Sequence, residues 1–239
     1  MIKQQIYGSG MIAKSFLNVE IPDDIIVIAA GVSNSQENSI SEFEREEKML
    51  ENIISNHANN KIVYFSSCSI YQSETTPYVT HKLKMEKLIK VKSSCYSIFR
   101  LPQVVGVSIN NTLISFLINA LLSKETIKVQ EKAKRHLIDV EDVVRITKIL
   151  ILDKRYNNTI TPICNGEKVS VSSIVKKIGA LLSIEPVTDS IDIGESYDIP
   201  YLHLKGILSS NDIIFSACYG DKLLNKYVPL IAAHYKSNN

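Results

Sequence analysis

The sequence has little glycine, few cysteines and no long apolar run. Nine glycines in 239 residues fall below the usual share of about 7%, so each glycine pair that does occur carries information. The four cysteines, Cys68, Cys95, Cys164 and Cys218, have no CxxC spacing, which suggests neither a zinc site nor a disulfide framework. We therefore expect four reduced cysteines in a cytoplasmic protein.

Charge and hydropathy exclude further classes of protein. A net charge of +2, from 27 basic and 25 acidic side chains, gives no reason to expect nucleic acid or an anionic membrane as partner. No apolar run approaches the roughly 18 residues of a transmembrane helix, and the first residues lack the pattern of a signal peptide. With 45% hydrophobic residues, the composition is that of an ordinary globular protein with a full core.

Short apolar runs of β type alternate with longer helical segments, and no repeat or Pro/Gly/Ser linker interrupts them. This alternation predicts an α/β, Rossmann-like doubly wound parallel sheet, with ligands at the carboxyl ends of the strands. Strands are expected over residues 2–7, 24–30, 61–66, 97–101 and 159–164. Helices are expected over residues 11–19, 41–57, 78–92, 111–122, 140–152, 172–182 and 223–235.

A glycine turn follows the first expected strand at once. Gly8-x-Gly10-x-x-Ala13 lies between a strand and a helix, the context that the dinucleotide fingerprint requires. Gly8 allows the tight turn, Gly10 lets the backbone approach a pyrophosphate, and the small Ala13 lets the helix pack on the strand. The pattern predicts a dinucleotide site, with a tight turn that binds no ligand as the alternative.

The second strand of a dinucleotide fold normally ends in an acidic residue about 20 residues after the glycines, and this chain lacks it. The first helix ends near Glu20, and the next strand, residues 24–30, leads into Gly31 like the fourth strand of the fold. We therefore expect the second and third strands to be missing. Lys3, Gln4 and Gln5 accordingly suit a strand at the sheet edge. Three carboxylates here are expected to be solvated or to replace a ribose contact: Glu20, Asp23 and Asp24.

A phenol and an ammonium lie four residues apart in Tyr78-Val79-Thr80-His81-Lys82, at the start of an expected helix. This spacing puts both groups on one helix face, so the cation favours release of the phenol proton. The strand before this helix ends next to Ser67, which supplies a hydroxyl where the strand meets the loop. Together these residues predict a Ser–Tyr–Lys site for proton transfer, although a lone YxxxK pattern is common by chance.

With these motifs in place, the chain resembles the extended short-chain dehydrogenase/reductase family of NAD-dependent nucleotide-sugar epimerases, dehydratases and ketoreductases. The resemblance implies a Rossmann-like fold and a nucleotide-activated sugar as substrate. It also implies NAD or NADP as cofactor, bound weakly because the second strand is missing, or not bound at all. The segments that carry the resemblance are 8–13, 26–34, 63–71, 77–82, 99–106, 135–144 and 159–175.

The resemblance assigns a role to each residue of the site, and it implies no metal ligand. Ser67 would polarise the substrate oxygen, Tyr78 would be the general acid and base, and Lys82 would hold the cofactor ribose. The remaining substrate contacts would come from Ser69, Asn110 and Arg135. Arg135 would meet the substrate diphosphate or would instead pair with Asp139 or Asp142. The cofactor contacts would come from Gly8, Gly10, Met11, Ile12, Ala30, Gly31, Lys82, Pro102, Val104 and Val105.

Two departures from the family pattern narrow the reaction. Cys68-Ser69 stands where related 4,6-dehydratases carry an Asp-Glu pair, so the chain has no carboxylate pair there to eliminate water. Ser69 also stands where 3,5-epimerising relatives carry a cysteine. We interpret Cys68 as a small packing residue. We interpret His81 as a solvated helix residue, because its neighbours point it off the face of Tyr78 and Lys82.

The leading hypothesis is a nucleotide-sugar 4-ketoreductase or 4-epimerase. Tyr78 would exchange a proton with the C4 oxygen while the nicotinamide carries the hydride. The alternative is a degenerate relative that binds no dinucleotide and is a binding or partner protein or a non-redox enzyme. Lysine in large excess over arginine, with abundant isoleucine and asparagine, is typical of an AT-rich bacterial genome, and surface-polysaccharide synthesis is a natural setting there.

The expected organisation is one shortened Rossmann-like domain with a small appendage. The main domain would span residues 1–165, with an excursion over about residues 107–135 that covers the sugar. Residues 166–239 would form a small C-terminal substrate-binding portion packed on it, because the pattern weakens after Pro186. A homodimer is compatible with the resemblance.

Overall fold

The computed structural model describes residues 5–108 and 112–237. The chain divides into two compact units. Unit 1 consists of Met1–Leu101 and Glu141–Ile163, and unit 2 of Pro102–Val140 and Cys164–Asn239. The expected domain boundary at residue 165 stays a prediction. The expected excursion and the C-terminal portion belong to the same compact unit.

Unit 1 contains a five-stranded parallel sheet in the order β1-β2-β3-β4-β9. The fold class expected from the sequence, α/β with a parallel sheet, is confirmed. The strands are β1 (Ile6–Tyr7), β2 (Ile25–Ile28), β3 (Lys61–Ser67), β4 (Cys95–Leu101) and β9 (Thr159–Pro162). The helices of this unit are α1 (Met11–Phe16), α2 (Ile40–Asn56), α3 (Pro77–Lys92) and α5 (Val140–Leu152), with 3-10 turns η1 (Cys68–Tyr71) and η2 (Lys154–Tyr156).

Strand β1 lies at the edge of the sheet, beside β2. No strand forms between Val19 and Asp24, and among the described residues no strand lies outside β1. The expected loss of two strands is therefore confirmed, because the dinucleotide fold flanks its first strand on both sides. Gln5 shows why polar residues suit this edge: its side-chain amide donates a 2.8 Å hydrogen bond to the carbonyl of Pro22.

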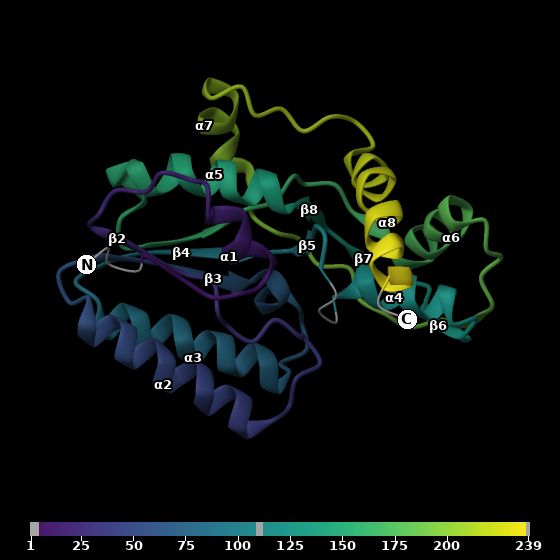
Figure 1. The fold of residues 1–239 in the computed structure, drawn as a ribbon, viewed down its shortest axis with the longest axis horizontal. Coiled ribbons are helices and arrows are strands. Elements are labelled where there is room, and N and C mark those ends of the chain that lie inside the picture. Colours follow the sequence, from purple (N-terminus) through teal and green to yellow (C-terminus); the bar gives the residue numbers. More distant parts are fainter. Residues whose placement is uncertain (1–4, 109–111, 238–239) are drawn as a thin grey trace. The chain divides into compact units, whose positions relative to one another are not determined.

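Side chains of the central strands alternate between two apolar layers, as pleated strands require. On one face, residues of α2 and α3 pack against alternate residues of β2, β3 and β4 around the fully buried Tyr64. On the other face, the ring of Phe65 lies 5.9 Å from that of Phe16 in α1 and 6.3 Å from that of Phe99. Figure 1 shows α2 and α3 side by side on one face of the sheet and α1 with α5 on the other.

Unit 2 combines a helical core with three short strand pairs, which the sequence pattern did not predict. Its core lies between α4 (Leu113–Leu122), α6 (Val171–Leu182) and α8 (Tyr219–Ser237). The parallel pairs are β5 (Gln103–Val105) with β8 (Leu137–Asp139) and β6 (Ile127–Gln130) with β11 (Thr188–Ile191). The antiparallel pair is β7 (Lys134–Arg135) with β10 (Val169–Ser170). The other elements are η3 (Leu202–Leu204) and α7 (Lys205–Ser210).

The caps of two helices explain where they begin. The Thr76 hydroxyl accepts a hydrogen bond from the Val79 amide at the start of α3, and Pro77 takes the first helical position, as helix N-termini favour. Ser170 caps α6 in the same way by accepting from the Ser173 amide.

In the described ranges, no helix has the length and apolar character that crossing a membrane requires. All four cysteines are free thiols.

Candidate active site

Several predicted site residues of unit 1 follow the carboxyl ends of the parallel strands, where open α/β sheets bind ligands. In register, Tyr7 pairs with Ile28 and Ile28 with Tyr64. The glycine turn after β1, the turn after β2 and the end of β3 therefore lie at the same level of the sheet. This arrangement places Gly8, Gly31 and Ser67 at the carboxyl end of the sheet, as their positions in the sequence predict.

The glycine turn has the tight backbone geometry that its sequence predicts. Gly8 has a φ of +137°, and a Cβ there would lie 2.4 Å from the carbonyl oxygen of Ala29, so a larger residue does not fit. The side chain of Ala13 is buried where α1 packs on the sheet. Gly10 is the N-cap of α1, and Met11 and Ile12 are half-buried in its first turn.

Ser67 lies at the last position of β3 and begins the 3-10 turn η1. Its hydroxyl oxygen accepts a 3.1 Å hydrogen bond from the Ser69 amide, which leaves the hydroxyl proton available to donate to a ligand. Cys68 is fully buried, and its thiol donates to the carbonyl of Arg100 at 3.3 Å. Its environment is that of a packing residue, as the sequence analysis interpreted it.

Tyr78 and Lys82 share one face of α3, and both side chains are buried. The ammonium nitrogen of Lys82 lies 5.7 Å from the centroid of the Tyr78 ring, within the range of a cation–π contact. Within the described part of the chain, the Tyr78 hydroxyl has no hydrogen-bond partner, so this phenol is available to a ligand. The i, i+4 pairing predicted from the sequence is thus present.

The ammonium of Lys82 makes its shortest contacts with Glu46 of α2, a residue that the sequence analysis did not single out. Nζ lies 3.0 Å from Oε1 and 3.3 Å from Oε2 of Glu46, and 3.0 Å from the hydroxyl of Tyr64. The Tyr64 hydroxyl in turn donates to Glu46 Oε1 at 2.6 Å. The Val32 amide donates to Oε2 at 2.7 Å. The carboxylate therefore joins α2, α3, β3 and the turn after β2.

This cluster determines the protonation of its members. Burial would raise the pKa of the Glu46 carboxyl, but the Lys82 ammonium and the hydrogen bonds of His81, Tyr64 and Val32 hold that pKa far below its ordinary value. Burial and the Glu46 carboxylate raise the pKa of the Tyr64 phenol well above its ordinary range. Glu46 is thus an anion and Tyr64 a neutral donor at neutral pH.

The interpretation of His81 as a solvated residue is wrong. The side chain is buried, its Nε2 lies 2.9 Å from Glu46 Oε2, and its ring stacks on Phe43 with centroids 4.5 Å apart. The error comes from considering one helix alone, because α2 covers the face of α3 that carries His81.

The sequence did contain a signal for Glu46. Phe43, Glu46, Leu50 and Ile53 recur at helical spacing in α2, and the last three are buried, so Glu46 lies on the apolar stripe of a charged helix. A lone carboxylate on such a stripe requires a buried partner. The partners lie on other elements, and only the tertiary structure identifies them.

The other predicted residues belong to unit 2. Val104 and Val105 lie in β5, Pro102 just before it, and Arg135 in β7. Asn110 lies outside the described residues. The predicted contacts of these residues with cofactor and sugar stay predictions.

Arg135 does not form an ion pair with Asp139, one of the two partners that the sequence analysis named. Its Nη1 donates to the carbonyls of Lys134 and Glu195 at 2.9 and 3.1 Å. The carboxylate of Asp139 instead contacts Lys226 at 3.0 Å and accepts from Tyr227 at 2.7 Å. Helix α8, rather than the β7 arginine, therefore neutralises this aspartate, and the guanidinium keeps donors for an anion.

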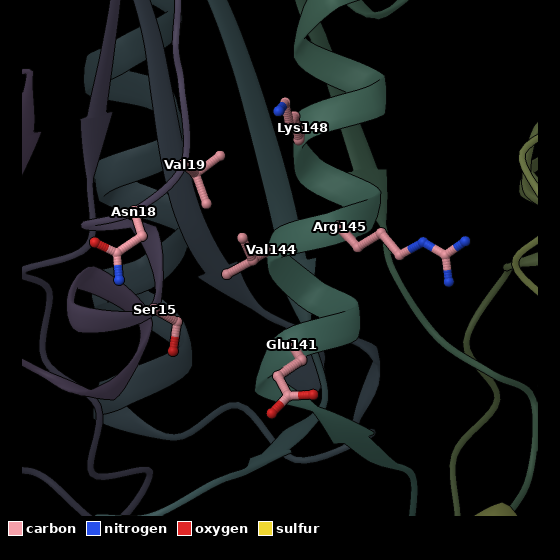
Figure 2. A pocket seen from close by; sticks show the side chains of 7 residues that line it. All are labelled: Ser15, Asn18, Val19, Glu141, Val144, Arg145 and Lys148. Carbon is pink, nitrogen blue, oxygen red and sulfur yellow. The ribbon is translucent and has the colours of Figure 1, made fainter.

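A cavity of about 310 Å³ lies between α1 and α5 in unit 1 (Figure 2). In Figure 2 the side chain of Val144 points towards the α1 side of the cavity, and that of Arg145 points away from it. Its lining consists of Ser15, Asn18, Val19, Glu141, Val144, Arg145 and Lys148. None of these residues was predicted for the site.

Comparison with known proteins identifies the family. A model of the family described as NAD dependent epimerase/dehydratase matches residues 9–161, more than half of the chain. The chain belongs to this family. Its members are NAD-dependent enzymes that include epimerases and dehydratases. No curated protein sequence matches the chain.

Solved structures of the family share the fold. A UDP-galactose 4-epimerase superposes with a TM-score of 0.71 at 13% identity, covering 95% of this chain and 83% of its own. A UDP-N-acetylglucosamine 4-epimerase from Bacillus cereus gives 0.65 at 19% identity, covering 87% and 79%. A dTDP-glucose 4,6-dehydratase from Bacillus anthracis, in complex with NAD, gives 0.67 at 14% identity, covering 90% and 75%. At these identities the likeness concerns the fold.

The glycine turn fits the pyrophosphate of a dinucleotide, whereas the bonds of Lys82 within the chain compete with a contact to the ribose. The turn at Gly8 brings bare backbone to the sheet edge, as a pyrophosphate requires. At the ribose end, the ammonium of Lys82 is already bonded to Glu46 and Tyr64. The ribose contact of Lys82 stays a prediction, and it has a competitor within the chain.

Proposed function

We propose that this epimerase/dehydratase family member is a nucleotide-sugar 4-ketoreductase or 4-epimerase in which Tyr78 transfers the proton. The observation that carries the proposal is the placement of the Lys82 ammonium 5.7 Å from the centre of the Tyr78 ring, beside the strand that ends at Ser67. A bound NAD or NADP would supply hydride transfer at the sugar carbon.

The residues of the chain divide the proton chemistry between them. Ser67, whose oxygen is held by the Ser69 amide, would donate its hydroxyl proton to the sugar oxygen. Tyr78 would give a proton to that oxygen or take one from it. Cys68 and Ser69 add no carboxylate, which favours reduction or epimerisation over elimination of water.

The substrate part of the proposal depends on unit 2 and on the family. Several solved relatives are named as enzymes of UDP- or dTDP-sugars. Arg135 in β7, held by two backbone carbonyls, would meet the diphosphate, and Ser69 and Asn110 would contact the sugar. Surface-polysaccharide synthesis in a bacterial cytoplasm, by a homodimer, completes the proposal.

Replacement of Tyr78 by Phe tests the chemistry. We expect turnover of UDP- and dTDP-sugars, followed by chromatography of the products, to fall by about 10²-fold or more, as for loss of a general acid. Binding of the sugar, measured by calorimetry, should change little because the ring is kept. Tyr96→Phe is the matched control, because Tyr96 is a buried tyrosine in the apolar layer between the sheet and helices α2 and α3. Full activity of Tyr78→Phe would contradict the proposal.

A second candidate is a relative that binds the sugar without redox chemistry. The engagement of Lys82 by Glu46 and the absence of described strands outside β1 favour it. Titration with NADH and NADPH separates the two candidates. Binding of nucleotide sugar without measurable binding of either dinucleotide at millimolar concentration would establish the second one.

A further inference from the structure

The ammonium of Lys82 has no donor to spare. An ammonium has three N–H donors, and three acceptor oxygens, two of Glu46 and one of Tyr64, lie within 3.3 Å of Nζ. Its side chain is 2% exposed and that of Glu46 is 0% exposed. A ribose hydroxyl that approached Lys82 would have to displace one of these oxygens.

The Glu46 carboxylate is held too firmly to yield its place readily. It accepts hydrogen bonds from the Val32 amide at 2.7 Å and from Tyr64 at 2.6 Å, and it contacts His81 at 2.9 Å. A buried carboxylate that leaves such partners gives up strong charge-assisted bonds. The pair with Lys82 is therefore part of the folded core.

Gly31 shows that the chain fills this space itself. A Cβ on Gly31 would lie 2.5 Å from Glu46 Oε1 and 2.7 Å from Lys82 Nζ. The glycine in the turn after β2, which the sequence analysis assigned to cofactor binding, thus accommodates two side chains of this protein. The space beside its Cα is occupied by a carboxylate and an ammonium.

We propose that Glu46 limits the affinity of this chain for dinucleotides, because its carboxylate takes the Lys82 ammonium that a nicotinamide ribose would otherwise use. The inference rests on the proposed function for the identity of the ligand. A dinucleotide then binds through the glycine turn without the help of Lys82. This conflict acts at the ribose end, independently of the missing second strand at the adenosine end.

Glu46→Gln tests the proposal by titration with NADH, followed by its fluorescence. The amide has one acceptor oxygen instead of two and no charge, so it releases Lys82. A charge-assisted contact regained by the ribose should lower the Kd for NADH by about tenfold or more. Glu47→Gln is the matched control: Glu47 is the next residue of α2 and pairs with Lys84 of α3 at 2.7 Å on the surface. An unchanged or higher Kd for Glu46→Gln would overturn the proposal.

A double variant, Glu46→Gln with Lys82→Met, keeps the proposal testable if the single variant does not fold. It removes both charges together, which buried ion pairs tolerate better than the loss of one partner. If Lys82 does not hold the ribose in the natural chain, the Kd for NADH should stay within about threefold of the original. A Kd about tenfold higher would show that Lys82 does bind the ribose, and the proposal would be wrong.

Failure of this inference is distinguishable from failure of the proposed function. Calorimetry with a UDP- or dTDP-sugar and turnover of Tyr78→Phe test the sugar chemistry without reference to Glu46. If the sugar binds and Glu46→Gln shows no gain for NADH, the inference is wrong while the proposed function stands. If NADH affinity rises and no sugar binds, the inference stands and the sugar substrate is wrong.

Discussion

At Gly31 the chain has no room for a side chain, because the carboxylate of Glu46 and the ammonium of Lys82 pack against its Cα. Both groups are held by further partners, so neither can move aside without loss of a hydrogen bond. A glycine that sequence patterns associate with ligand binding is required here by the packing of the protein itself.

We expect Gly31→Ala to lower the free energy of unfolding by about 1–3 kcal/mol, as overpacking does. Urea unfolding followed by circular dichroism measures this change. Gly206→Ala is the control, since no atom lies within 4 Å of a Cβ at that position. Equal stability of Gly31→Ala and the natural chain would mean that the cluster rearranges freely.

At the scale of elements, Glu46 joins α2 to α3, β3 and the turn after β2. Surface ion pairs join the same two helices: Lys84 contacts Glu47 and Lys92 contacts Glu51, each at 2.7 Å. Solvent and salt screen these exposed pairs, whereas the buried pair is shielded. The packing of α2 on α3 therefore depends far more on Glu46 than on its surface neighbours.

The stability of this cluster should depend on pH in acid. The folded pKa of Glu46 lies below its ordinary value of 4.5, so its stabilisation is complete above that value and declines as the pH falls. We expect the free energy of unfolding of the natural chain to decrease below about pH 4.5, with a smaller decrease in Glu46→Gln. Urea unfolding between pH 3 and 7 measures both curves. Parallel curves would contradict the prediction.

At neutral pH the same two positions should differ in their effect on stability. Glu46→Gln leaves a buried cation with an incomplete set of partners, which should cost about 3 kcal/mol. Glu47→Gln removes an exposed pair with Lys84 and should cost less than about 1 kcal/mol. Thermal or urea unfolding of the two variants checks the order, and an equal loss would show that the buried pair contributes nothing special.

At the scale of the whole molecule, the edge position of β1 removes one wall of a dinucleotide site. No described strand outside β1 supplies the acidic or basic residue that distinguishes NAD from NADP in the dinucleotide fold. We expect NADH and NADPH to bind weakly, with Kd values within about tenfold of each other. Parallel fluorescence titrations measure this ratio. Tight, NADP-selective binding would show that another segment has rebuilt the adenosine site.

Much of unit 1 was predictable from local patterns, and unit 2 was not. Apolar runs and the glycine turn predicted β1 to β4, and polar Gln5 indicated that β1 lies at an edge. The strand pairs of unit 2 contain as few as two residues each, in β7 and β10. Such short strands have no periodicity of their own, because their pairing depends on residues distant in the sequence.

The sequence by itself determined the parallel sheet, the loss of the strands outside β1, and the helix face that Tyr78 and Lys82 share. Strand and helix periods are local properties of the chain. Only the tertiary structure decided the partners of these side chains. Glu46 and Lys82 are 36 residues apart, and the burial of His81, a residue of α3, depends on α2. A buried charge is stable only where partners converge on it, and that convergence is a property of packing rather than of sequence pattern.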